Sequence, residues 1–243
     1  MNLRSKLIRL AYENPEIRPD ILPLLKKAYS LNVGSTSLAK ARVFAEEVFQ
    51  KPVEEVLPDF DRNYKRLQKA VKSAPGIPRI QMPVIEPADI KVFQKRLQEG
   101  RLDILRPFAK GKFVTMREID KSDGEWVDLG FEDGDPKDDA IPAQVKSIAV
   151  GKLKPTQNQI WLEKTFGNIA KFGVPRSGSP VLSTTVIVSS DGYILDGHHR
   201  YSQAMMADPN LKMKALYVPM PIKTLLEVGK AYGEAIGNKP KQA

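Results

Sequence analysis

A predicted β-hairpin that leads directly into a helix is the feature that most constrains the fold of this chain. Residues 184–188 are β-branched and apolar, residues 190–192 have the composition of a turn, and residues 193–195 favour a short second strand. Residues 201–207 then have helical propensity, with no helix breaker before Pro209. The hairpin and the helix therefore fix the geometry of the five residues that join them.

Those five residues are Asp196, Gly197, His198, His199 and Arg200, and they include both histidines of the chain. The first backbone N–H groups of a helix have no partner within the helix, and the helix dipole is positive at that end, so a helix start attracts anions. Gly197 permits a close approach of the backbone, and Arg200 offers a planar fork that can bind a phosphate through two hydrogen bonds. The junction therefore predicts a phosphate-binding site.

The remaining side chains of the junction are candidates for catalysis. His198 and His199 point in different directions at a helix start, so one can donate to a phosphate oxygen while the other contacts the leaving group or orients a carboxylate. Asp196 has two readings, as a magnesium ligand acting through water or as the cap of the helix. Zinc is disfavoured, because adjacent helical side chains diverge by about 100° and the chain has no third histidine and no cysteine.

The composition limits the classes of protein to which the chain can belong. The absence of cysteine excludes thiol catalysis, disulfides and thiolate metal sites, and it suits a reducing compartment. No stretch approaches the roughly 18 apolar residues of a membrane span, and the N-terminus has no features of a secretory signal. We therefore expect a soluble, cytoplasmic protein that has no membrane partner.

The chain divides into three parts by composition, and together they predict an α+β fold. Residues 1–74 form a helical basic region, and residues 75–140 form a linker and a small α/β segment, because four prolines lie between positions 75 and 87. Residues 141–236 alternate between strand and helix patterns and predict a small mixed-sheet domain. Helices are expected at 3–10, 37–50, 53–57, 60–73, 88–98, 159–172 and from Pro221, and further strands at 113–116, 125–129, 145–150 and 213–218. The acidic stretch 132–139 is interpreted as a solvated turn rather than a calcium loop.

Residues 143–232 resemble a ParB/sulfiredoxin-like domain. The resemblance rests on the strand that ends in Leu153-Lys154-Pro155, the helix that follows it, the hairpin, and the junction at 196–200. It implies that the glycine and basic residues at the helix start hold the phosphates of ATP or ADP. The form with two histidines is similar to that of the free serine kinases of this fold. Sulfiredoxins use a catalytic cysteine, so the resemblance does not extend to sulfinic-acid reduction.

Further site residues come from the same resemblance. Glu163 lies on the helix where the similar kinases carry a catalytic carboxylate, although an ordinary surface glutamate is an alternative reading. Lys154, Thr156 and Gln157 lie at the strand end that contributes nucleotide contacts in this superfamily. The polar residues Ser177, Gly178 and Ser179 are a candidate phosphate loop or a plain connection.

Three functions remain open from the sequence. The first is a nucleotide-dependent phosphotransferase or hydrolase that uses ATP or ADP with Mg²⁺. The second is a DNA-binding ParB-like module or nuclease, in which the basic helices of residues 1–74 contact the phosphate backbone, in keeping with the net charge of +9. The third is a non-enzymatic binding protein that residues 1–74 recruit to a larger protein assembly.

Overall fold

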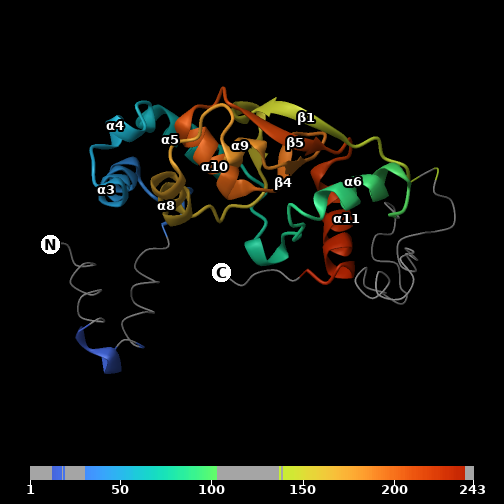
Figure 1. The fold of residues 1–243 in the computed structure, drawn as a ribbon, viewed down its shortest axis with the longest axis horizontal. Helices are drawn as coiled ribbons and strands as arrows, with labels where there is room; N and C mark the ends of the chain where they lie inside the picture. Colours follow the sequence, from blue (N-terminus) through green and yellow to red (C-terminus); the bar gives the residue numbers. More distant parts are fainter. Residues whose placement is uncertain (1–12, 18, 20–30, 103–136, 138, 239–243) are drawn as a thin grey trace.

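The computed structural model describes residues 13–17, 19, 31–102, 137 and 139–238, and a five-stranded mixed sheet lies at its centre (Figure 1). The strand order is β1-β5-β3-β4-β2. Neighbours β1/β5 and β3/β4 are antiparallel, whereas β3/β5 and β2/β4 are parallel. The strands are β1 (Gln144–Ala149), β2 (Lys154–Pro155), β3 (Val186–Val188), β4 (Tyr193–Asp196) and β5 (Lys212–Tyr217). This sheet and the helices around it confirm the predicted α+β class.

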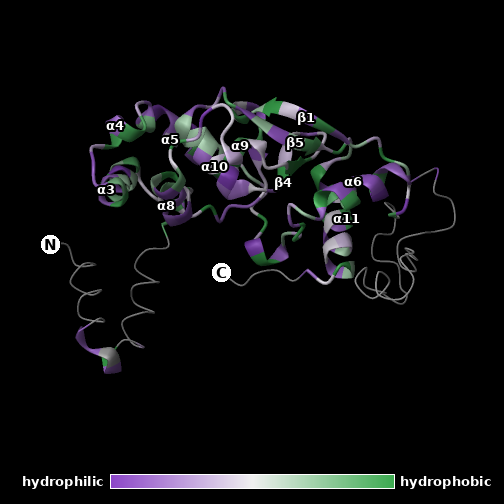
Figure 2. Ribbon diagram, in the orientation of Figure 1, coloured by the Kyte–Doolittle hydropathy of each residue, from purple (hydrophilic) through white to green (hydrophobic). Residues whose placement is uncertain are grey.

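Helices cover both faces of the sheet, and most of them carry alternating hydrophilic and hydrophobic segments (Figure 2). The α-helices are α3 (Leu38–Phe49), α4 (Val53–Val56), α5 (Phe60–Lys72), α6 (Ile90–Gln98), α8 (Leu162–Phe172), α9 (Pro180–Ser183), α10 (His198–Ala207) and α11 (Ile222–Ala235). Single 3₁₀ turns are η1 (Pro15–Ile17), η2 (Arg79–Gln81) and η3 (Val150–Lys152). Among the helices of the described residues, none combines the length and the apolar character needed to cross a bilayer.

Two hydrophobic cores lie on opposite faces of the sheet. Successive side chains of a strand point to opposite faces, so Val186 and Val188 enter one core while Ile187 enters the other. In the same way, Ile194 belongs to the first core and Leu195 to the second. The first core is completed by α3, α5, α8 and α10, and the second by α6 and α11.

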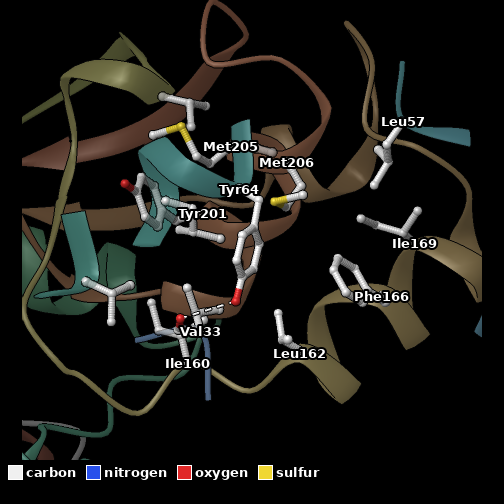
Figure 3. Close-up of a cluster of buried hydrophobic side chains, with 14 of the residues drawn as sticks. Val33, Leu57, Tyr64, Ile160, Leu162, Phe166, Ile169, Tyr201, Met205 and Met206 are labelled. Atoms are coloured by element: carbon white, nitrogen blue, oxygen red, sulfur yellow. Dashed lines mark hydrogen bonds between the residues drawn. The ribbon is translucent and has the colours of Figure 1, made fainter. Parts of the chain in front are cut away.

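The first core joins the N-terminal helices to the sheet domain (Figure 3). The rings of Phe44, Phe49 and Phe60 all lie within 6.2 Å of the ring of Phe166, measured between centroids. Asn63 of α5 donates its amide to the carbonyl of Met206 at the end of α10. The helices of residues 31–72 therefore share one core with residues 141–236, and the packing does not separate the chain where its composition changes.

Most predicted elements agree with the structure, but the strand expected to end in Leu153-Lys154-Pro155 is broken by η3, and Lys154–Pro155 form the separate strand β2. The helix predicted over 37–50 is α3, and the hydroxyl of its N-cap Ser37 accepts from the backbone of Lys40. The strand predicted over 145–150 ends one residue earlier, because Val150 begins the 3₁₀ turn η3. The helix predicted over 159–172 begins only at Leu162. The predictions for residues 3–10, 113–116 and 125–129, and nearly all of the acidic turn, lie outside the described residues.

The proline-rich segment 75–87 is attached to the sheet domain and is not a free linker. The backbone amides of Gly76 and Ile77 both donate to the carbonyl of Thr156, at 3.1 and 3.3 Å. The amide of Arg79 donates to the side chain of Gln159 at 2.8 Å. Farther along, Met82 and Ile85 are buried. The segment thus crosses the end of the sheet as a fixed wall.

The fit between this wall and α11 gives a first testable prediction. A Cβ at Gly233 would lie 2.9 Å from the carbonyl oxygen of Val84, which is a backbone atom that cannot move aside easily. We expect G233A to destabilise the protein by about 1–2 kcal/mol. Overpacking costs about 1–3 kcal/mol, and the better helix propensity of alanine offsets up to about 1 kcal/mol of that cost. The matched control is G167A in α8, where nothing lies within 4 Å of the added Cβ. Urea denaturation should show G167A equal to or more stable than the parent, and equal stability of the two variants would contradict the packing.

Candidate functional site

A cleft of about 540 Å³ lies between the proline-rich wall and the start of α10. This volume is typical of pockets that bind small ligands. The wall contributes mainly apolar residues together with Arg79 and Glu86, and the junction between β4 and α10 contributes mainly polar ones. The lining residues are Arg79, Met82, Pro83, Val84, Ile85, Glu86, Pro87, Gln157, Thr184, Leu195, Asp196, Gly197, His198, His199 and Arg200. We refer to this space as the α10 cleft.

The polar side is built on a sharp turn at Gly197. Asp196 is the last residue of β4 and pairs with Ile187, and Gly197 then takes a left-handed conformation with φ 101° as the N-cap of α10. A Cβ at this position would collide with the side chain of Val186. Only glycine therefore allows the strand to turn directly into the helix at this point.

The turn leaves backbone donors at the helix start. The first hydrogen bond of α10 runs from the amide of Tyr201 to the carbonyl of Gly197. Within the part of the chain that the structure describes, the amides of His198, His199 and Arg200 have no hydrogen-bond partner. These three donors lie at the positive end of the helix dipole, as the sequence predicts for an anion site.

Arg200 and Asp196 form a pair that organises the turn. The Arg200 guanidinium donates to the Asp196 carboxylate at 2.9 Å and to the carbonyls of Thr184 and Thr185 at 3.0 Å each. Burial raises the pKa of the Asp196 carboxyl, and the charge of Arg200 opposes that shift. The cap of the helix is Gly197 and not the Asp196 side chain, so the capping interpretation is wrong. Only some N–H donors of the Arg200 guanidinium remain for a ligand, because two protein carbonyls and a carboxylate already accept hydrogen bonds from it.

His198 is an acceptor inside the protein. Its Nε2 accepts from the backbone amide of Thr156 at 3.0 Å and lies 3.4 Å from that of Gln157. This arrangement places the ring proton on Nδ1. Burial, together with the nearby His199, Arg79 and Arg200, lowers the pKa of His198 to about 3. The ring is therefore neutral near pH 7, and it fixes the Thr156–Gln157 backbone against α10.

His199 has a similar state and a different partner. Its Nε2 accepts from the backbone amide of Trp161 at 3.4 Å. Burial lowers the pKa of His199 to about 3, and the charges of Lys164 and Arg79 act in the same direction. Both histidines are thus neutral acceptors through Nε2, and each ties α10 to the segment between β2 and α8. Any contact with a ligand would come from Nδ1.

Two other side chains that line the cleft have polar groups without a partner among the described residues. Across the described ranges, the half-buried Arg79 side chain makes no hydrogen bond or ion pair, and its charge acts on Asp196 and both histidines. Gln157 is 5% exposed, and its Oε1 has no hydrogen-bond partner among the described residues. An unpaired cation and an unsatisfied buried amide in one cleft favour a polar ligand there.

Several predicted site residues do not line the α10 cleft. Glu163 lies at the start of α8, and its Oε1 accepts from the amide of Leu31 at 2.7 Å. The Thr156 side chain is buried and donates to the carbonyl of Ile194 at 2.6 Å. Lys154 lines a different cavity, beside Tyr193. Ser177, Gly178 and Ser179 form the turn before α9, where the Ser179 hydroxyl accepts from the amide of Arg176.

Sequence reasoning missed the apolar wall and Arg79. The segment was interpreted as a linker because its four prolines give neither helical nor strand periodicity. The wall is recognisable only through long-range contacts, such as the bridge between Ile77 and Gln157. A basic residue directly after Gly76-Ile77-Pro78 was the one local signal available.

The structure offers few groups for a metal ion. No cluster of three or more metal-ligating side chains occurs within the described residues. The carboxylates that line the α10 cleft are Asp196 and Glu86. Magnesium commonly takes only one or two carboxylates, with water and substrate phosphates completing its shell. The cleft therefore fits a magnesium ion only together with a phosphate ligand.

Comparisons with protein-family models, with curated proteins and with solved structures found no match to this chain.

Proposed function

We propose that the α10 cleft binds ATP or ADP, with a phosphate group at the start of α10 and Arg79 beside it. The observation that carries this proposal is the turn at Gly197, which leaves three backbone amides without a partner among the described residues, on residues that line a cleft of about 540 Å³. The resemblance to ParB/sulfiredoxin-like domains supports the same ligand.

The two sides of the cleft suit the two parts of a nucleotide. The amides of residues 198–200, Arg79 and the remaining donors of Arg200 are hydrogen-bond donors for a phosphate. Met82, Val84 and Ile85 belong to the apolar wall, which suits the base and the ribose carbon atoms. Asp196 and Glu86 would hold Mg²⁺ through water, and the ion would neutralise charge on the phosphates.

We further propose that the protein transfers or hydrolyses a phosphate of the bound nucleotide, in a cytoplasmic setting. This part rests on the resemblance to free serine kinases. In this proposal His198 and His199 are positioning residues. Their neutral rings accept hydrogen bonds through Nε2 from the backbone amides of Thr156 and Trp161, and so hold these segments against α10. Phosphate release from ATP with Mg²⁺ tests this part separately, and binding without release would leave the site a nucleotide sensor.

Arg79 gives the sharpest test of nucleotide binding. We expect R79A to weaken ADP binding by about 10- to 100-fold, since a hydrogen bond to a charged group contributes about 1.5–3 kcal/mol. K91A is the matched control, because Lys91 is exposed on α6 and lines neither this cleft nor the cavity beside Lys154. Isothermal titration calorimetry of ATP and ADP, with and without Mg²⁺, measures both variants. Equal affinity of R79A and K91A for the nucleotide would refute the placement of the phosphate.

A further inference from the structure

A second cavity, of about 410 Å³, lies between α5 and the β2–β4 edge of the sheet. It is separate from the α10 cleft, because the two have no lining residue in common. Its cationic lining residues are Arg66, Lys69 and Lys154, and its apolar floor includes Leu153 and Met205. We call this cavity and the exposed side of α5 beside it the α5 groove.

The exposed side of α5 carries an unbalanced positive charge. Arg62 pairs with Asp59, and Asp61 pairs with Arg42. The exposed side chains of Lys65, Arg66, Lys69 and Lys72 have no ion-pair partner within the described part of the chain. A second hollow of about 380 Å³ lies along Lys65, Gln68, Lys69, Lys72 and Ser73. Lys69 and Ser73 line both spaces, so the two form one continuous basic surface.

Tyr201 lines the inner end of the groove, and its hydroxyl is buried without a partner among the described residues. Tyr64 in the same core has protein partners, because its OH lies 3.3 Å from the carbonyl oxygen of Val33 (Figure 3) and donates to the carbonyl of Thr36 at 2.8 Å. An orphaned buried hydroxyl is unfavourable unless a ligand or water completes it. The Tyr201 hydroxyl therefore points to a polar ligand group in the cavity.

An aromatic ring lies in the same cavity. The Lys154 ammonium is 5.1 Å from the centre of the Tyr193 ring and donates to the carbonyl of Asp191 at 3.2 Å. Proteins bind single strands by combining an aromatic ring with a row of cations: the cations follow the phosphates, and the bases contact aromatic and apolar surface.

We infer that the α5 groove binds single-stranded nucleic acid, with phosphates along α5 and one base in the cavity beside Tyr193 and Tyr201. Lys65, Lys69 and Lys72 follow one another along one side of the helix over about 10 Å. A row of this length suits the repeated charges of a phosphodiester chain better than a single small anion. The inference is independent of the nucleotide proposed for the α10 cleft.

Fluorescence anisotropy with a labelled oligothymidylate of about 12 nucleotides tests the inference on the full chain. We expect K65A/K69A/K72A to bind at least about 10-fold more weakly, with a salt dependence that is shallower by about 2 in the log–log slope. The control K91A/K212A/K214A removes the same charge from exposed lysines elsewhere, and it should bind like the parent. Equal weakening of the two triple variants would overturn the inference. Tighter binding of a duplex of the same length, or competition by inorganic phosphate as effective as that by unlabelled strand, would also overturn it.

Y201F separates a ligand contact from a structural role. The hydroxyl has no protein partner within the described residues, so its removal should leave the melting temperature unchanged or raise it. We expect Y201F to weaken binding of the oligonucleotide by about 3- to 10-fold despite that stability. Unchanged affinity of Y201F would show that no nucleotide reaches the cavity, and would overturn this placement of the base.

Discussion

G197A is expected to destabilise the protein by about 3–5 kcal/mol and to abolish nucleotide binding. A left-handed backbone costs a residue with a Cβ about 1–3 kcal/mol, and the added Cβ also collides with Val186 in the core. The turn must move to relieve the collision, and the amides of residues 198–200 move with it. Chemical denaturation gives the stability, and calorimetry with ADP gives the binding. G167A in α8, which meets no neighbour, is the control for the Gly→Ala change itself.

A double-mutant cycle with V186A identifies the cause of that loss. V186A alone removes buried methyl groups and should cost about 2 kcal/mol. Combined with G197A, it opens the space that the new Cβ needs, so the two effects should be less than additive by at least about 1 kcal/mol. Strict additivity would mean that the collision with Val186 is not what excludes alanine.

Acid is expected to destabilise the protein below about pH 6.5 through its two histidines. Their pKa values are lowered from 6.5 to about 3 in the folded state, so the unfolded chain binds protons first as the pH falls. Stability from this source is complete above pH 6.5 and is lost as the pH falls toward 3. The slope is at most about 1.4 kcal/mol per pH unit for each histidine. Between pH 7 and 5 the free energy of unfolding should fall by about 2–4 kcal/mol, with a discount for the partly exposed His199.

The control for the acid effect is H198Q/H199Q. A glutamine Oε1 can still accept from the amides of Thr156 and Trp161, but it does not titrate. Asp196 is retained in this variant, and its raised pKa acts in the opposite direction, so the difference between variant and parent isolates the histidines. Urea denaturation across the pH range should give a flatter profile for the variant. Parallel profiles would show that the histidines are not buried in the neutral form.

The local geometry of the candidate site followed from the sequence. The β-branched run, the turn at 190–192 and the absence of a breaker before Pro209 predicted the hairpin and α10, and the structure confirms them. These features depend on residues that are neighbours in sequence, which is why period and propensity were sufficient. The close approach of a ligand to the backbone at Gly197 stays a prediction, while the structure shows that glycine is needed there because a Cβ would meet Val186.

The partners of the site residues depend on the tertiary fold and could not be predicted in the same way. No local pattern shows that the Thr184 and Thr185 carbonyls lie beside Arg200, or that Leu31 donates to Glu163. Lys154 was assigned to the nucleotide from its place at a strand end. In a two-residue strand, however, adjacent side chains point to opposite faces, and Lys154 faces the α5 groove.

The central claim is that the backbone amides at the start of α10 bind a nucleotide phosphate, and amide chemical shifts measured by NMR during an ADP titration test it most directly. The claim predicts saturable shifts of the His198, His199 and Arg200 amides, with the same dissociation constant that calorimetry gives. In R79A the same amides should shift at higher ADP concentrations. Saturation by ADP that leaves these three amides unchanged, or no binding of ADP at all, would contradict the claim.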